Sequence, residues 1–155
     1  MKKLSFFIVV TIIGIFLQSL FMGSDFFLPA ILLILQNNNV HLAMITGLGW
    51  LLIQEGVSSL PFGSVFLVYI AFYIAFYWLK FYLKTQSFWF VLIMGCFCGT
   101  LYYFSISIIA EISNFLINFD ILTKNFLLQI ILFPCAWMFY NFLYKKYFSS
   151  ISNIF

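Results

Sequence analysis

Few side chains in this chain could do acid–base or metal chemistry. The 155 residues include four acids and a single histidine, His41. A general base needs a partner that orients it, and a metal site needs several ligands that converge. The acids instead stand far apart, each at the end of an apolar run or in a loop, where we expect them on the outer side of a membrane. These acids are Asp25, Glu55, Glu111 and Asp120. The sequence therefore predicts no catalytic residue, no metal site and no cofactor.

Three cysteines are the remaining candidates for nucleophiles or metal ligands. Cys96, Cys98 and Cys135 all lie within apolar runs, with no histidine near them in sequence. Cys96 and Cys98 would point in different directions from a helix, so we do not expect a ligand pair. We interpret all three as small packing side chains. The chain also lacks a glycine-rich phosphate-binding loop and the motif of paired aspartates with glycine and arginine found in lipid phosphotransferases.

The composition indicates which elements carry these residues. Hydrophobic residues make up 65% of the chain and charged residues 7%, whereas roughly a quarter of the residues in a soluble domain are charged. A transmembrane helix needs roughly 20 apolar residues. The chain therefore predicts an all-α integral membrane protein, a compact bundle of about six transmembrane helices that forms a single domain over residues 1–155. The spans are predicted at about 4–22, 26–35, 40–53, 65–83, 88–110 and 126–144.

The lysines predict the orientation of the bundle. All seven basic residues are lysines, and they stand at the ends of apolar runs. Six spans with a cytoplasmic amino terminus put every lysine except Lys124 on the cytoplasmic side, as the positive-inside rule requires. Both termini are therefore expected in the cytoplasm, although the second span is short for a full crossing. Nucleic acid is not expected as a partner, because no basic patch is interleaved with polar residues that would follow phosphates.

Two glycines on the predicted fifth span, Gly95 and Gly99, are four residues apart and share one helical face. Such a pair lets a second helix approach closely. Packing within the bundle is the favoured interpretation, and contact with another protein is the alternative.

The segment from Gly47 to Gly63, GLGWLLIQEGVSSLPFG, has the most specific chemistry in the chain. A helix is predicted to end near Glu55, followed by a turn that contains Ser58 and Pro61. Serine hydroxyls bond local backbone groups, and proline and glycine permit a sharp turn. We expect a tight outer hairpin in which Glu55 accepts hydrogen bonds from free N–H groups of the loop.

This segment resembles the rod shape-determining protein MreD family. That family commonly has a glycine, an acid eight residues later, and then a Ser-Gly-x-Pro-x-Gly run that leads into the next helix. The matching residues here are Gly47, Glu55, Ser58, Pro61 and Gly63. Glutamate replaces the usual aspartate at position 55, and serine replaces the usual glycine at position 59.

Parts of the last span are also similar to the family, namely Gln129, Pro134 and the terminal lysine pair. The resemblance implies a non-enzymatic scaffold of the bacterial inner membrane in the cell-elongation machinery, which maintains rod shape through peptidoglycan synthesis. The implied partners are an MreC-like bitopic membrane protein and, through it, an MreB-like filament and the wall synthases, besides the lipid bilayer itself.

The family fold is similar to the substrate-binding subunits of energy-coupling-factor transporters. A small-molecule-binding membrane subunit of such a transporter is therefore the alternative function. Those subunits dock their transmembrane partner through alanine-rich patches on the first helix. The first span here, IVVTIIGIFLQSL, lacks an Ala-x-x-x-Ala patch, which argues against the alternative.

Overall fold

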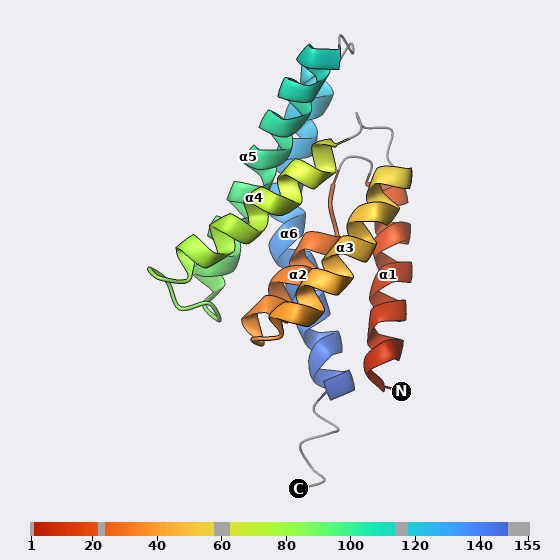
Figure 1. The fold of residues 1–155 in the computed structure, drawn as a ribbon, viewed down its shortest axis with the longest axis vertical. Coiled ribbons are helices and arrows are strands. Elements are labelled where there is room, and N and C mark those ends of the chain that lie inside the picture. The colour runs from red at the N-terminus through yellow and green to blue at the C-terminus, as the bar shows by residue number, and fades with distance from the viewer. Residues whose placement is uncertain (1, 22–23, 58–62, 114–117, 149–155) are drawn as a thin grey trace, which may run out of the picture.

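The computed structural model describes residues 2–21, 24–57, 63–113 and 118–148. In these residues the regular secondary structure is entirely helical (Figure 1), so the all-α prediction is confirmed for this part of the chain. The helices are α1 (Lys2–Leu20), α2 (Phe27–Gln36), α3 (Val40–Val57), α4 (Ser64–Leu79), α5 (Phe88–Ser113) and α6 (Phe119–Phe148).

Several helix boundaries differ from the predicted spans. Helix α3 continues through Glu55 to Val57, and α4 ends at Leu79, before the lysine that was expected to lie within its last turn. Helix α6 begins at Phe119 rather than near residue 126, so Asp120 and Lys124 lie on a helix and not in a loop. Apolar runs mark the part of a helix that contacts other apolar groups, and they do not mark the turns that extend beyond it.

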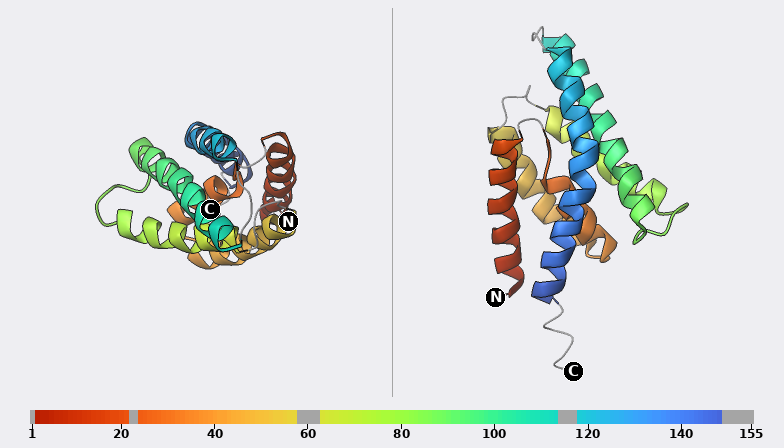
Figure 2. Two further views of the ribbon diagram at one scale, coloured as in Figure 1. Left: turned by 90° about the horizontal axis from the view of Figure 1, so that it is seen from above. Right: turned by 180° about the vertical axis from the view of Figure 1, so that it is seen from behind.

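Helix α2 lies at the centre of the molecule, and the other five helices surround it (Figure 2). All ten of its residues are buried. Its sequence, FLPAILLILQ, is apolar on every face, which is typical of a helix enclosed by protein. Pro29 lies in its first turn, where the missing N–H has no partner within the helix. The short second run is therefore a central core helix.

Aromatic side chains connect the helices on one side of α2. The ring of Phe27 on α2 stacks on Trp50 of α3, with centroids 5.2 Å apart. The indole N–H of Trp50 donates a hydrogen bond of 2.8 Å to the hydroxyl of Thr11 on α1. This hydrogen bond connects α1 to α3. It also orients the Trp50 side chain against Phe27 at the start of α2.

Two helices in the described part of the chain are long and apolar enough to cross a membrane. These segments are Phe88–Ile112 in α5 and Asp120–Tyr147 in α6. At about 1.5 Å per residue, α5 is roughly 39 Å long and α6 roughly 45 Å, whereas α2 is roughly 15 Å. The hydrocarbon layer of a bilayer is about 30 Å thick.

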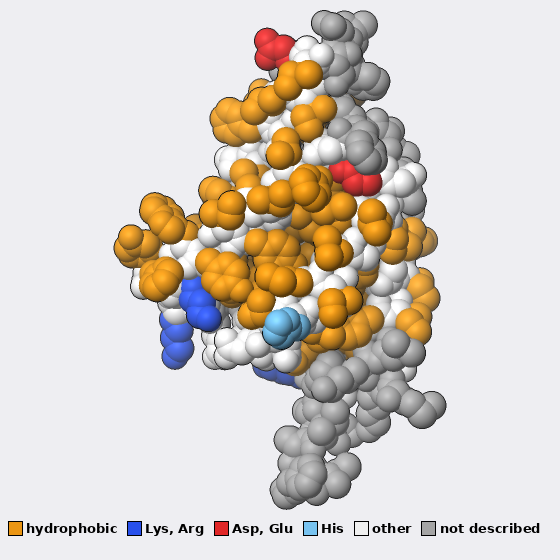
Figure 3. All heavy atoms as spheres, in the orientation of Figure 1, with side chains coloured by type: hydrophobic (Ala, Val, Ile, Leu, Met, Phe, Trp, Pro, Cys, Tyr) orange, Lys and Arg blue, Asp and Glu red, His pale blue; other side chains and the backbone are white. Residues whose placement is uncertain are grey.

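The outward faces of the helices are strongly apolar, and on the face drawn in Figure 3 the acidic and basic side chains lie apart. In the view of Figure 3, acidic side chains lie in the upper half, and lysine and histidine lie in the lower half. The amino-terminal end of α1 and the carboxy-terminal end of α6 also lie together at the lower end (Figure 2). Exposed apolar side chains include Ile12, Phe16, Ile45, Leu52, Ile74, Phe104 and Ile131.

Candidate functional site

The chain enters the bundle in a non-helical segment just before α2. Figure 1 shows residues 24–26 descending into the space that α2 occupies. Ser24, Asp25 and Phe26 are all buried, and Asp25 is only 2% exposed. Asp25 lies between two helices, as expected from the sequence, but it is enclosed by the bundle. The acid follows α1 in sequence, but its peptide lies inside the bundle because α2 begins there.

The Asp25 carboxylate caps the amino terminus of α2. One oxygen, Oδ1, accepts hydrogen bonds from the backbone N–H groups of Phe27 at 2.7 Å and Leu28 at 3.2 Å. The other, Oδ2, accepts a 2.8 Å hydrogen bond from the hydroxyl of Tyr102 on α5. The first N–H groups of any helix lack intrahelical partners, and a carboxylate at that end also interacts favourably with the helix dipole. The acid thus joins the start of α2 to α5.

Gln129 on α6 binds the backbone of the same residue. Its Oε1 accepts a hydrogen bond from the Asp25 N–H at 2.8 Å, and its Nε2 donates one to the Asp25 carbonyl at 3.0 Å. Gln129 is 1% exposed. A primary amide can make both bonds at once because it carries a donor and an acceptor side by side. Non-helical backbone inside an apolar bundle requires such partners, since no neighbouring strand supplies them.

More buried polar side chains surround this centre. Tyr69 and Tyr140 lie close enough to Asp25 for its charge to act on them. The Gln54 amide faces the carboxylate but makes no hydrogen bond of standard geometry. The hydroxyls of Ser24, Tyr69 and Tyr140 likewise have no hydrogen-bond partner among the described residues. We refer to Asp25, Tyr102 and Gln129 with these four side chains as the Asp25 centre.

The chemistry available at the Asp25 centre is that of a hydrogen-bonded junction. The side chains acting on the carboxylate, Tyr102 and Gln54, are neutral. Within the described ranges, no three His, Cys, Asp or Glu side chains gather where they could hold a metal ion. A helix amino terminus inside a bundle is a potential anion site, but here the chain's own carboxylate occupies it.

A second acid, Glu55, caps a different helix. Its carboxylate accepts hydrogen bonds from the Gly63 N–H, at 3.1 Å to Oε2 and 3.2 Å to Oε1, and from the Phe66 N–H at 3.2 Å. Both donors lie at the start of α4, and Gly63 has the positive φ of +92° that glycine adopts at little cost. Glu55 therefore joins the end of α3 to the start of α4. Ser58 and Pro61, the other predicted hairpin residues, lie outside the described residues.

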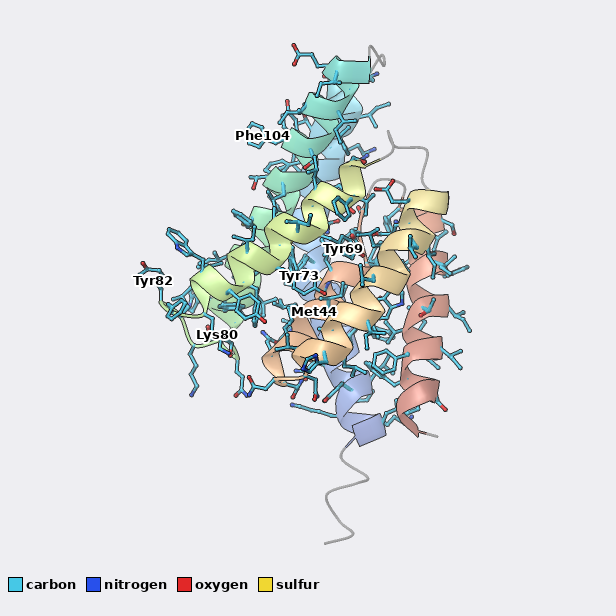
Figure 4. All side chains as sticks on the ribbon, viewed as in Figure 1. Met44, Tyr69, Tyr73, Lys80, Tyr82 and Phe104 are labelled. Carbon is cyan, nitrogen blue, oxygen red and sulfur yellow. The ribbon has the colours of Figure 1, made fainter. Side chains whose placement is uncertain are left out.

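Gly47 lies away from this hairpin and packs against α4. A Cβ atom at Gly47 would lie 2.5 Å from the hydroxyl oxygen of Tyr73. That hydroxyl donates a 2.8 Å hydrogen bond to the carbonyl of Ala43, one turn earlier on α3. Figure 4 shows Tyr69 and Tyr73 between α4 and α3. The lack of a side chain at Gly47 allows this interhelical hydrogen bond to form.

The glycine pair on α5 faces α6. A Cβ at Gly95 would lie 3.2 Å from the Phe133 ring, and one at Gly99 would lie 3.1 Å from Phe126 and 3.2 Å from Ile130. The two helices pack closely along this face. The close approach brings α6 near Tyr102 on α5, which lies one turn beyond Gly99.

Replacing Gly99 with valine should therefore lower the free energy of unfolding by about 1–3 kcal/mol, the usual cost of overpacking a tight contact. Thermal unfolding of the purified protein in detergent measures the effect. Gly49→Val is the matched control, because a Cβ at Gly49 meets no atom within 4 Å. Equal melting temperatures for the two variants would contradict the proposed packing role of Gly99.

Sequence reasoning missed the Asp25 centre. One local signal was present, since an aspartate just before an apolar run and a proline early in that run are both typical of a helix start. Gln129 was noted only for its resemblance to a family, and Tyr102 was not distinguished from the other tyrosines. Comparison of the chain with protein-family models, curated proteins and solved structures gives no match, so the function must be argued from the geometry of these residues.

Proposed function

We propose that this chain is a non-enzymatic scaffold of the bacterial inner membrane in the cell-elongation machinery, of the MreD type, which docks an MreC-like bitopic partner. The observation that carries this proposal is the occupation of the α2 amino terminus by Asp25. In many membrane transporters, a transmembrane helix is interrupted within the membrane, and the amino terminus of its second half holds an anionic group of the substrate. Here the chain's own carboxylate occupies that position, which disfavours the alternative of a small-molecule-binding transporter subunit.

The proposed environment is a bilayer crossed by the whole bundle. Exposed apolar side chains on α1, α3, α4, α5 and α6 support this, because a soluble monomer rarely exposes so continuous an apolar surface. The segment that contains Asp25 would then form, together with α2, one discontinuous crossing, in which Gln129 and Asp25 satisfy the non-helical backbone. The lower end of the molecule, where α1 begins and α6 ends, would face the cytoplasm by the positive-inside rule.

The proposed docking surface lies at the outer ends of α3 and α4. Glu55 and Gly63 set the direction in which α4 leaves this end of α3. A bitopic partner contributes a single transmembrane helix, which binds best to a rigid surface because little conformational entropy is then lost. The cap at the start of α4 supplies that rigidity.

Glu55→Ala and Gly63→Val should each lower the amount of an MreC-like partner that co-purifies with the protein. The first change removes charge-assisted hydrogen bonds worth about 1.5 kcal/mol. The second places a β-branched residue at a φ of +92°, which costs about 1–3 kcal/mol. The measurement is the ratio of partner to bait after tandem purification from membranes, normalised to folded bait on size exclusion.

Gly49→Val is the control for both variants, since a Cβ at Gly49 meets no atom within 4 Å and the residue lies on α3 well before the proposed docking surface. It should retain the partner as well as the parent does. If Glu55→Ala and Gly63→Val also insert normally and keep the full amount of partner, the hairpin is only a connection and this docking surface is wrong.

A further inference from the structure

The connection between α4 and α5 forms a rigid corner that projects sideways from the bundle (Figure 1). We call residues 78–89 the α4–α5 corner. The N–H of Phe81 donates to the carbonyl of Trp78 at 3.3 Å, that of Tyr82 to Leu79 at 3.0 Å, and that of Ser87 to Lys84 at 3.0 Å. Successive turns of this kind hold the backbone of the corner in one shape.

The inner side of the corner is attached to the bundle. Leu79 and Leu83 are partly buried and pack against the core. The side-chain amide of Gln36, the last residue of α2, donates a 2.6 Å hydrogen bond to the carbonyl of Thr85. The indole N–H of Trp137 on α6 in turn donates to Gln36 at 2.9 Å. The corner is therefore held at the polar end of α2, beside the turn into α3.

The outer side of the corner carries large aromatic rings that the fold does not use. Phe81 is 88% exposed, and Tyr82, Trp89 and Trp78 are each exposed by about 70%. The rings of Trp78 and Tyr82 contact each other edge to face, with centroids 5.7 Å apart. Tryptophan and tyrosine combine an apolar ring with one polar atom and are enriched where hydrocarbon meets headgroups.

Two lysines accompany the rings, and the segment contains no acid. Lys80 and Lys84 are both exposed, and Figure 4 shows Lys80 beside Tyr82 at this corner. The local charge is positive without compensation from residues 78–89. A lysine stem can lie along apolar surface while its ammonium group reaches phosphate oxygens. Charge and ring chemistry thus favour the same occupant, an anionic lipid.

We infer that the α4–α5 corner binds anionic phospholipid, with Trp78, Tyr82 and Trp89 in the headgroup layer and Lys80 and Lys84 on the lipid phosphates. The site is independent of the docking surface on α3 and α4. The corner presents a preformed surface, since hydrogen bonds and buried leucines fix its backbone. It selects lipids by charge, and each lysine contributes roughly five-fold to association with an anionic surface at moderate salt.

The test uses the full chain in vesicles of phosphatidylglycerol and phosphatidylcholine, with one lipid brominated at a time, and reads quenching of tryptophan fluorescence. Trp78 and Trp89 are exposed, whereas Trp50 is buried and Trp137 partly buried. Brominated phosphatidylglycerol should quench at least about twice as strongly as brominated phosphatidylcholine at equal content. The double variant Lys80→Gln, Lys84→Gln should bring the two values together.

Lys145→Gln, Lys146→Gln is the matched control, because it removes an exposed lysine pair from α6 without touching the corner. It should keep the preference for phosphatidylglycerol, and Trp78→Phe, Trp89→Phe should abolish it. Equal quenching by both lipids in the parent, or a preference that survives Lys80→Gln, Lys84→Gln, would overturn the inference. Weak quenching by either lipid would also overturn it and would indicate that protein covers the corner.

Discussion

Replacing Asp25 with alanine is expected to lower the free energy of unfolding by about 3 kcal/mol or more. The change leaves the N–H groups of Phe27 and Leu28 and the hydroxyl of Tyr102 without their acceptor. A buried polar group that loses its partner costs about 1–3 kcal/mol, and water cannot replace the partner in an apolar bundle. Unfolding in detergent, followed by circular dichroism as denaturing surfactant is added, measures the loss.

Asparagine at the same position separates the contribution of the capping hydrogen bonds to stability from the contribution of the negative charge. The asparagine side chain keeps an oxygen for the two N–H groups, and its amide can donate to the Tyr102 hydroxyl, so Asp25→Asn should recover at least half of the lost stability. Asp120→Ala removes an exposed acid from the first turn of α6 and should cost less than about 1 kcal/mol. If Asp25→Ala is no more harmful than Asp120→Ala, Asp25 does not hold the start of α2 in place.

Gln129→Leu is expected to cause the second large loss in the free energy of unfolding. Leucine approximates the volume of glutamine but makes neither of the two bonds to the Asp25 peptide. The N–H and carbonyl of Asp25 then lack partners inside the bundle, which we expect to cost about 2–5 kcal/mol. Hydrogen exchange read by mass spectrometry gives a local measurement, because peptides that cover residues 24–28 should lose protection first.

Two further variants sharpen this test. Gln129→Glu keeps an acceptor for the Asp25 N–H, but an ionised glutamate cannot donate to the carbonyl and places a second acid beside Asp25. It should therefore be at least as harmful as leucine. Gln18→Leu, at a partly buried position on α1, should leave protection of residues 24–28 unchanged. Full protection of that segment in Gln129→Leu would show that Gln129 is not its partner.

The Asp25 centre and the Glu55 cap stabilise different parts of the bundle. Asp25 and Gln129 secure the segment that leads into the central helix, and Glu55 sets the direction of α4. Asp25 and Glu55 bond N–H groups at helix starts, and Gln129 bonds the non-helical backbone of Asp25. Several buried or partly buried polar side chains of this apolar chain thus supply partners for backbone groups at or next to helix ends.

The helical class and the apolar outer faces can be read from the sequence alone, and so can the predicted turn at Glu55 and Gly63 and the shared face of Gly95 and Gly99. These depend on residues close together in the chain. An apolar run indicates a helix, glycines four apart share a face, and an acid eight residues before a glycine can reach that glycine across a turn. Such patterns can be read without knowing which helices touch.

The burial of Asp25, in contrast, follows from how the helices pack and cannot be read from the sequence. In sequence Asp25 stands at the end of an apolar run, like the other acids, and its surroundings follow from the position of α2 inside a ring of five helices. Its partners Tyr102 and Gln129 are 77 and 104 residues away in the chain. Periodicity describes which face of one helix is apolar, but helix packing decides which polar groups from distant helices meet.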